Sequence, residues 1–279
     1  MHVLLALSLL LQQDDLDARV AKLVQDLGSD DLEVRGAAER DLVKLGPKAR
    51  AAIARHRDHR DVDVRGRIEA LLRSVALLPV DDALRDRLRA LDAAADLPAL
   101  GKAAVALVKA DRTKLRDALA VCAKEAGETL RFRAAQLGNL LAADAVEGLR
   151  YGILFLAAET KAGAGLAAVP VWVNDNEKEV ALWRSSGIGT AVRLRKTADG
   201  AELEGQVFVL EEPTADTFAV PGRSAVAGDP PVEVLGDGAR PGTYTASACY
   251  TSDDQYVKDK PAGFWKGRLT SPAVEITVR

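Results

Sequence analysis

The chain has 279 residues, of which 48% are hydrophobic and 28% charged, and these values are ordinary for a globular protein. They exclude long disordered tracts, collagen and fibrous coiled coils. The formal net charge of -3 provides no overall positive field for a polyanion, so we do not expect bulk binding of nucleic acid. Because only 4% of the residues are aromatic, the core must consist mainly of Ala, Leu and Val.

The chain begins with an apolar run, Val3–Leu11, which is followed at once by the polar residues 12–15. This run is too short to span a bilayer as a helix, but it fits the apolar core of a secretory signal peptide. We therefore expect residues 1–13 to be a signal peptide, with no transmembrane segment after its cleavage. The protein would then be exported to the periplasm, the cell surface or the medium. The alternative is a first helix whose apolar start packs on the helices that follow.

An internal repeat follows this segment. Asp31–Gly36 (DLEVRG) and Asp61–Gly66 (DVDVRG) match at an offset of 30 residues. Each block continues with apolar residues at helical spacing, namely Val34, Ala38, Leu42 and Leu45 in the first and Val64, Ile68, Leu71, Leu72 and Val75 in the second. A further helix is expected before each block, over residues 16–28 and 49–55. The pattern predicts helical pairs that stack side by side and bury Val34 and Val64 between them.

Start and stop signals support these helices. Asp30 and Glu33 have the spacing of a capping box, which predicts the start of the first repeated helix. Gly46 and Pro47 predict its end, and Asp61 is placed to cap the second repeated helix.

The Asp-x-x-Val-Arg blocks resemble HEAT-like repeats, and their order after an apolar leader is similar to that of exported HEAT-repeat proteins of planctomycete-type bacteria. The resemblance covers about residues 14–78. It implies an α-helical repeat region of the ARM type, in which the Asp begins the second helix of a pair and the Val is buried. It also implies that the Arg packs against an acidic residue of a neighbouring repeat. These roles would fall to Asp31, Val34 and Arg35, and to Asp61, Val64 and Arg65.

Residues 79–148 continue with helical periodicity but without a recognised Asp-x-x-Val-Arg block. Four helices are marked by leucines and small residues, beginning near Asp81, Asp96, Leu115 and Leu130. Two repeats are too few for an independent stack. We therefore expect this region to cap them, either as degenerate repeats or as a small bundle.

After Gly148 the apolar residues recur at the spacing typical of strands rather than of helices. Residues 243–250 alternate clearly, with Tyr244, Ala246, Ala248 and Tyr250 on one face. Strands are expected at 149–158, 169–173, 180–183, 191–195, 205–210, 232–235, 243–250 and 273–278. Eight short strands within residues 149–279 are typical of a β-sandwich.

Two segments of this region, Pro241–Thr245 and Ser271–Val278, resemble strands of immunoglobulin-like domains of bacterial surface proteins, although the Cys-Trp-Cys hallmark is missing. The sequence therefore predicts a multidomain chain, α then β. HEAT-like helical repeats over 14–78 and helices over 79–148 precede an immunoglobulin-like antiparallel β-sandwich over 149–279.

The pattern of reactive residues does not indicate catalysis. The histidines all lie in the first quarter of the chain, whereas a nucleophilic triad needs one near its nucleophile. No pair of carboxylates is singled out for glycoside hydrolysis by an aromatic neighbourhood, except near Trp265, where Asp253, Asp254 and Asp259 lie, and we expect no catalysis there. Cys122 and Cys249 are expected to be small buried residues without a disulfide. We therefore expect no enzymatic activity and no cofactor.

Possible metal ligands occur in three turns. His56 and His59 have chelating spacing if Asp61 or Asp63 approaches, while residues 174–177 and 253–254 offer oxygen atoms suited to Ca²⁺. Turns use the same residue types for their own hydrogen bonds, so no metal is expected.

Two groups of residues are candidates for binding a partner. Residues 48–73 hold eight Lys and Arg against four acids, and of these we select Arg55, Arg57, Arg60 and Arg67. The second group is Tyr256, Phe264 and Trp265, beside the polar stretch 253–263, although Trp265 can instead pack over the sandwich edge.

We expect an exported, non-catalytic scaffold that binds a protein partner in the cell envelope through its helical repeats. The first alternative is a carbohydrate- or surface-binding module that uses the aromatic group of the β-sandwich. The second is a carboxylate- or metal-dependent enzyme, which no residue spacing supports.

Overall fold

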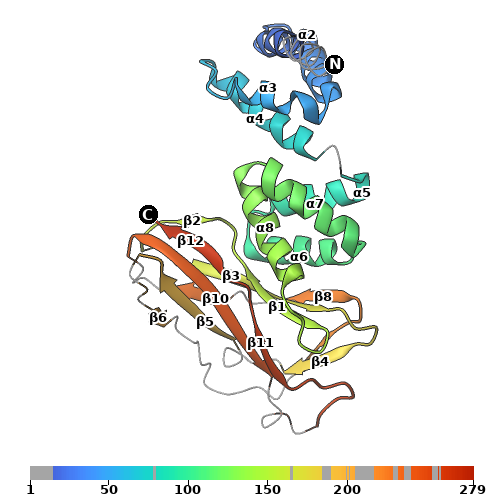
Figure 1. Cartoon of the computed structure of the whole chain (residues 1–279), viewed down its shortest axis with the longest axis vertical. Coiled ribbons are helices and arrows are strands. Elements are labelled where there is room, and N and C mark those ends of the chain that lie inside the picture. Colours follow the sequence, from blue (N-terminus) through green and yellow to red (C-terminus); the bar gives the residue numbers. More distant parts are fainter. Residues whose placement is uncertain are drawn as a thin grey trace, which may run out of the picture. The chain divides into compact units, whose positions relative to one another are not determined.

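The structure is a computed structural model of the chain. It describes residues 15–77, 80–163, 166–183, 190–198, 200, 202–204, 217–228, 232–235, 240–252, 257 and 259–279. A helical region is followed by a region of mostly antiparallel sheets (Figure 1). The expected signal peptide at 1–13 and the expected strand at 205–210 lie outside the described residues.

The chain forms two compact units. Unit 1 consists of Met1–Arg85 and Lys124–Gly127, and unit 2 consists of Asp86–Ala123 and Glu128–Arg279. The boundary thus lies within a helix, α5 (Asp82–Ala93), rather than at residue 148 where the sequence changes its period. Each unit is described separately below.

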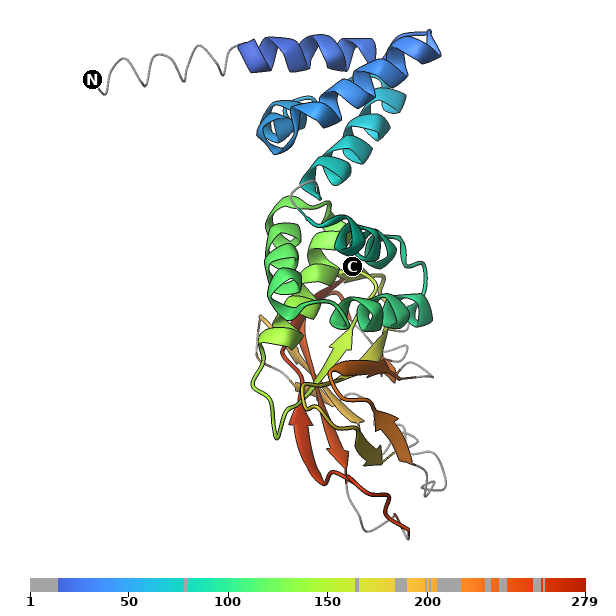
Figure 2. The same ribbon diagram turned by 90° about the vertical axis from the view of Figure 1, so that its right-hand side faces the viewer.

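Unit 1 is built from helices (Figure 2). Their buried side chains form one apolar core. Its elements are a first helix over residues 15–26, α2 (Leu32–Leu45), the 3-10 turn η1 (Pro47–Ala49), α3 (Arg50–Ala54), α4 (Val62–Ala76) and the start of α5. The core contains Val20, Val24 and Leu27 of the first helix, Ala38, Leu42 and Leu45 of α2, Ile53 of α3, and Val64, Ile68, Leu71 and Leu72 of α4. The helices expected from the sequence are therefore present in unit 1.

The turns that lead into α2, α4 and α5 are capped in the same way. The carboxylates of Asp31, Asp61 and Asp81 accept hydrogen bonds from the backbone amides two residues later, at 2.7, 2.8 and 3.1 Å. The expected capping box at Asp30 is wrong by one position, because Asp31 is the residue with extended backbone that precedes the first helical turn.

The arginine that follows each cap bonds the backbone of the turn before its helix. Arg35 Nη1 donates to the carbonyl of Ser29 at 2.5 Å, and Arg65 Nη1 donates to that of His59 at 2.7 Å. Arg85 Nη2 donates to the carbonyl of Val80 at 2.7 Å in the same manner. The acidic partner in a neighbouring repeat, implied by the resemblance, is therefore wrong for Arg35 and Arg65. Each arginine instead connects its helix to the turn that precedes it through these hydrogen bonds.

The cap at Asp61 makes a testable link between pH and the stability of unit 1. Backbone hydrogen bonds from Val64 and Asp63 lower the pKa of its carboxyl below the usual 3.8. Because the folded-state pKa is the lower one, the stabilisation is complete above about pH 4 and is lost as the pH falls through the lowered pKa. We expect Asp61→Asn, which keeps a capping oxygen that does not titrate, to flatten the acid limb of unfolding. Circular dichroism melts between about pH 2 and 5 measure this, and identical slopes for both proteins contradict it.

The burial expected for the two repeated valines is confirmed for one of them. Val64 is buried, and its Cγ2 lies against Gly28 at the end of the first helix, 3.3 Å from where a Cβ would be. Val34, its counterpart in α2, is 39% exposed, so the expectation for this residue is wrong. The contact with Gly28 is consistent with the burial of Val64 in α4.

Unit 2 contains two sheets and a short pair of strands in the part of the chain described. The first sheet has the order β1 (Leu149–Leu154), β3 (Leu166–Asn174), β8 (Ser224–Ala227), with β9 (Val232–Leu235) also paired to β3. The second has the order β2 (Glu159–Thr160), β12 (Val274–Val278), β10 (Gly242–Ser252), β5 (Thr190–Lys196), β6 (Glu202–Glu204), with β11 (Gly267–Thr270) on β10. The pair is β4 (Val180–Trp183) and β7 (Thr217–Val220). Among these pairings β2 with β12 is parallel and the others are antiparallel.

Helices cover the first sheet on the face that does not meet the second sheet (Figure 1). Helix α6 (Leu97–Val108) contacts β3 and β8, and α8 (Glu128–Ala142) contacts β1. α6 approaches so closely that a Cβ on Gly101 would lie 2.8 Å from Ala227 Cβ. β3 is consequently buried along both faces, as strands between two layers are. Together with α7 (Arg112–Glu125) as far as Ala123, these helices belong to the same unit as the sheets.

The two sheets enclose an aromatic cluster. Trp172 lies with ring centroids 5.4 Å from Tyr151, 4.9 Å from Phe218 and 5.3 Å from Tyr250. Tyr250 donates from its hydroxyl to the carbonyl of Trp183 at 2.6 Å, and burial raises the pKa of that hydroxyl. The face of β10 that carries Tyr244, Ala246, Ala248 and Tyr250 is buried here, which confirms the expectation from its alternation.

Candidate functional site

Two of the four arginines selected in unit 1 are neutralised within the unit. Arg55 pairs with Asp17, and Arg57 Nε lies 3.1 Å from Glu69 Oε1. Arg60 and Arg67 have no acidic partner among the residues that the structure describes. Arg60 is exposed in the turn before α4, so it is available to an outside group.

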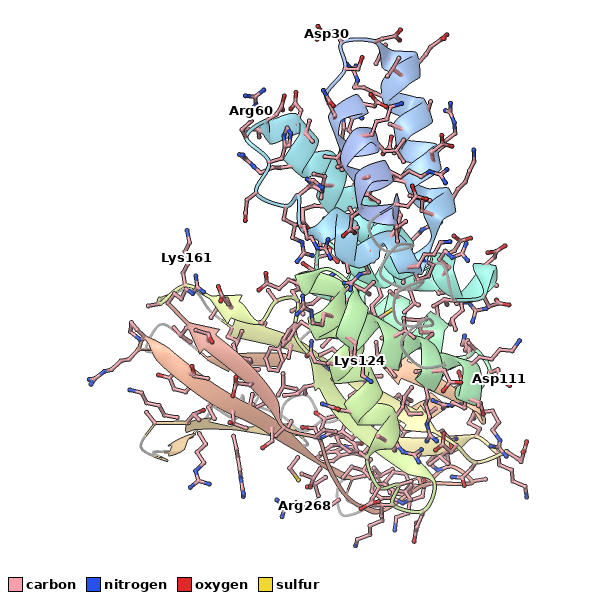
Figure 3. The ribbon with its side chains drawn as sticks, turned by 45° about the horizontal axis from the view of Figure 1, so that its top comes forward. Asp30, Arg60, Asp111, Lys124, Lys161 and Arg268 are labelled. Carbon is pink, nitrogen blue, oxygen red and sulfur yellow. The ribbon has the colours of Figure 1, made fainter. Side chains whose placement is uncertain are left out.

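The same edge of unit 1 exposes apolar side chains that sequence reasoning missed. Leu32 is 74% exposed and Val62 is 67% exposed, although both are large aliphatic residues. They occupy equivalent positions directly after the caps, in the first turns of α2 and α4. Figure 3 shows Asp30 and Arg60 at the turns that precede these helices. We call this surface, made by Asp30, Leu32, Val34, Arg60 and Val62, the N-terminal edge. The sequence does contain a sign of this surface, because the second residue of each repeated block, Leu32 or Val62, is apolar.

A glycine stands one helical turn after each of these apolar residues. Gly66 is exposed, and apart from its chain neighbours and its own helix backbone no described atom lies within 4 Å of the place where its Cβ would be. Gly36 holds the same position in α2 and faces the end of the flexible Arg40 side chain at 3.4 Å. Glycine within a helix costs about 1 kcal/mol relative to alanine. No packing within unit 1 explains it at position 66, and it leaves the helix backbone open beside Val62.

The aromatic group expected to bind a sugar does not form an exposed platform. Trp265 is only 7% exposed, and its indole nitrogen donates to Glu147 Oε2 at 2.8 Å. Phe264 is half-buried, and Tyr256 lies outside the described residues. Stacking of a sugar needs an exposed ring face, so the expected role of Trp265 as a platform is wrong. Its buried position agrees with the alternative that it packs at the edge of the sheets.

The turns that offered metal ligands use those atoms internally. His59 Nδ1 accepts a hydrogen bond from the Asp61 amide at 3.2 Å, and the Asp61 carboxylate caps α4. In the second turn Asn174 Oδ1 accepts a hydrogen bond from the Asn176 amide at 2.9 Å, and the carboxylates of Asp175 and Glu177 pair with arginines. Within the described ranges no group of three or more His, Cys, Asp or Glu is arranged to hold a metal ion. Residues 253–254 lie outside these ranges.

The two cysteines, Cys122 and Cys249, are free and buried, as expected from their numbers and spacing. Burial raises the pKa of the Cys122 thiol to about 12, so this group is protonated and unreactive at neutral pH. Cys249 lies beside a charged side chain, since Arg268 Nε donates to its Sγ at 2.6 Å.

Arg268 also lines a groove of about 580 Å³ in unit 2. The walls come from the end of α8 and the residues that follow it, from the start of β1, and from β11 with its exit; the polar lining residues are Asn139, Asp144, Arg150, Arg268, Thr270 and Ser271. Arg150 is fixed in its wall, because its Nε donates to the carbonyl of Ala143 at 2.7 Å and its Nη1 pairs with Asp175. Figure 3 labels Arg268, which belongs to the wall made by β11.

Comparison with protein families gave no match, and neither did comparison with curated proteins. Among solved structures the chain is similar to that of Pseudomonas fluorescens alkylpurine DNA glycosylase AlkC bound to DNA containing an abasic site analog, at 15% identity and a TM-score of 0.27. The likeness covers 93% of this chain and 64% of that one, so this chain spans less than two thirds of that protein. At this TM-score it carries no argument about fold or activity.

In the described part of the chain, none of the helices has the length and apolar character needed to cross a bilayer.

Proposed function

We propose that the protein is an exported, non-catalytic scaffold that binds a protein partner in the cell envelope through unit 1. In this proposal the helices of unit 1 are a short HEAT-like stack, and the strands of unit 2 form an immunoglobulin-like sandwich. The identical caps at Asp31, Asp61 and Asp81 support a repeated helical unit. The face-to-face sheets with a shared core support a sandwich.

The observation that carries the proposal is the exposure of Leu32 and Val62 at equivalent positions of two repeated helices. Single exposed apolar residues are ordinary on a protein surface. Two exposed aliphatic residues at equivalent positions of two repeated helices, one of them a turn before the open Gly66, offer apolar surface that another chain can cover. Arg60 adds an unneutralised positive charge to this surface.

The chemistry of the N-terminal edge defines the partner. A complementary protein segment offers aliphatic or aromatic side chains to Leu32 and Val62 and a carboxylate to Arg60. Burying two such apolar side chains contributes roughly 1.5–3 kcal/mol each, which is enough for them to dominate a small interface.

Substitution of both apolar residues tests this proposal. We expect the full-length double variant Leu32→Ser/Val62→Ser to lose at least about tenfold in affinity for the envelope partner captured by the wild type. Its thermal midpoint should stay close to that of the wild type, because both side chains are already exposed in the folded chain.

The matched control is Val146→Ser, since Val146 is an exposed valine of unit 2 that is 44% accessible. This variant should bind the partner as the wild type does. Equal affinity of the wild type and the double variant contradicts the proposal, as does an envelope extract in which the wild-type chain enriches no protein.

Export has its own test. The apolar run Val3–Leu11 supports cleavage near residue 13. We expect the protein isolated from the producing cells to begin close to residue 14 and to fractionate with the envelope or the medium. Recovery of a chain with an intact N-terminus from the cytoplasm contradicts export.

A further inference from the structure

The groove of unit 2 carries charge on two opposite walls. One wall holds Arg150 at the start of β1, and the other holds Arg268 on β11. Ala142, Val146 and Pro272 supply accessible apolar surface in the lining, and Asn139 and Thr270 add an exposed amide and hydroxyl. Its volume of about 580 Å³ falls in the range of sites for small organic molecules.

The charge around this groove is not balanced. Behind the Arg150 wall, Arg112 Nη2 shares Asp175 with Arg150 at 2.9 Å, and Arg116 Nη2 donates to the carbonyl of Leu141 at 3.1 Å. The carboxylates near these groups are Asp175 and Asp144, the latter being exposed in the groove lining. Burial lowers the pKa of Arg150, and the neighbouring Arg116 lowers it further. In the lining itself two guanidinium groups, Arg150 and Arg268, stand against one carboxylate, Asp144, and Arg150 is already paired with Asp175.

Arg268 is the cation whose charge is left unneutralised. Its Nε donates a hydrogen bond to Cys249 Sγ, which orients the guanidinium. Its terminal nitrogens have no ion pair or hydrogen bond with any described residue. A guanidinium oriented in this way presents a two-pronged donor to a planar anion.

We infer that this groove binds a small organic carboxylate, with its charged group on Arg268 and its apolar body against the accessible side chains of Ala142, Val146 and Pro272. The carboxylate neutralises the excess charge, and the apolar walls favour a hydrocarbon body over a simple inorganic anion. Asp144 opposes a second negative charge near Arg150, so a single carboxylate fits better than a dianion. This binding function is independent of the interaction proposed for unit 1.

Calorimetric titration of the full-length protein with hexanoate and with hexanol tests this inference. The two probes have the same alkyl chain and differ in charge at one end. We expect saturable millimolar binding of hexanoate, at least about tenfold weaker binding of hexanol, and weakening of the hexanoate signal by added salt. A second arm uses a short apolar peptide with a free or an amidated C-terminus. If hexanoate and the peptide with a free C-terminus bind and the amidated peptide does not, the natural ligand can be a peptide end. If hexanoate binds and neither peptide does, the natural ligand is a free acid.

Arg268→Gln should weaken hexanoate binding at least about tenfold, because it removes the charge and keeps a hydrogen-bond donor. The matched control is Arg193→Gln on β5, an exposed strand arginine that does not line the groove. It makes the same change in net charge and should bind as the wild type does. A third variant, Ala142→Trp, fills the groove while leaving both arginines in place and should abolish binding. Equal binding of hexanoate and hexanol, no saturation, or full binding by Arg268→Gln overturns the inference.

Discussion

Replacement of Arg133 by methionine is expected to lower the free energy of unfolding of unit 2 by at least about 3 kcal/mol. Arg133 lies on α8 and is only 6% exposed. Its Nη1 donates to the carbonyls of Leu91 and Asp92 at 2.7 and 2.8 Å, and its Nε donates to that of Leu156 at 2.9 Å. Methionine has similar length and no donor, so three carbonyls lose their partner, at roughly 1 kcal/mol or more for each.

Arg131, two residues earlier on the same helix, provides the control. Arg131 is exposed, so Arg131→Met should change the free energy of unfolding by less than about 0.5 kcal/mol. All three tryptophans of the chain, Trp172, Trp183 and Trp265, belong to unit 2, so urea unfolding followed by tryptophan fluorescence reports on the correct unit. Similar midpoints for the two variants contradict a role of Arg133 in joining α8 to α5 and to the segment after β1.

This joining role was not predictable from the sequence. The helical spacing of Leu130, Ala134 and Leu137 marked α8 and its apolar face correctly. Arg133 and Gln136 lie between these positions and read as solvent-facing residues. In the structure both are buried, and Gln136 exchanges hydrogen bonds with the backbone of Phe155 at 2.8 and 3.1 Å. The pattern of one helix does not reveal that a sheet covers its polar side as well.

Local signals predicted the helices of unit 1 better than the contacts between them. The pattern Asp-x-x-Val-Arg located the starts of α2 and α4 within one residue, because the cap is a local device that needs only a carboxylate and a free amide. The third example, Asp81 with Leu84 and Arg85, went unrecognised since Leu replaces Val, although its hydrogen bonds are the same. Exposure of Val34 was not predictable, because it depends on what precedes α2 in space rather than on the helix itself.

The candidate binding surfaces were found only in part. Arg60 was selected from local charge, but Arg55 and Arg57 were selected on the same basis and prove to be paired. Arg150 and Arg268 were not selected, since they are 118 residues apart and nothing local relates them. Their approach depends on β1 and β11 lying in different sheets of one unit, which strand periodicity does not specify.

A valine in place of Gly101 is expected to lower the free energy of unfolding of unit 2 by at least about 2 kcal/mol, measured by tryptophan fluorescence as above. A Cβ at this position would lie 2.8 Å from Ala227 Cβ and 3.0 Å from Val169 Cγ2, and both neighbours belong to strands of the covered sheet. Neither of them is the end of a flexible side chain, so α6 must move away from the sheet to admit the new atoms. Overpacking of this kind outweighs the gain of about 1 kcal/mol or less from removing a helical glycine.

Variants at Gly66 of α4 distinguish the effect of overpacking on stability from the effect of helix propensity. Gly66 also lies within a helix, but beyond its chain neighbours and its own helix backbone no described atom lies within 4 Å of its Cβ position. Gly66→Val should therefore leave stability unchanged or raise it by roughly 0.5 kcal/mol, and Gly66→Ala should raise it by roughly 1 kcal/mol. Unit 1 has no tryptophan, so circular dichroism at the helical band is the measurement for these two variants. A loss of stability at Gly66 as large as that at Gly101 would show that packing against the sheet is not what requires glycine on α6. Stabilisation at Gly66 together with loss of the envelope partner would instead assign that glycine to the N-terminal edge, where an open helix backbone serves binding rather than folding.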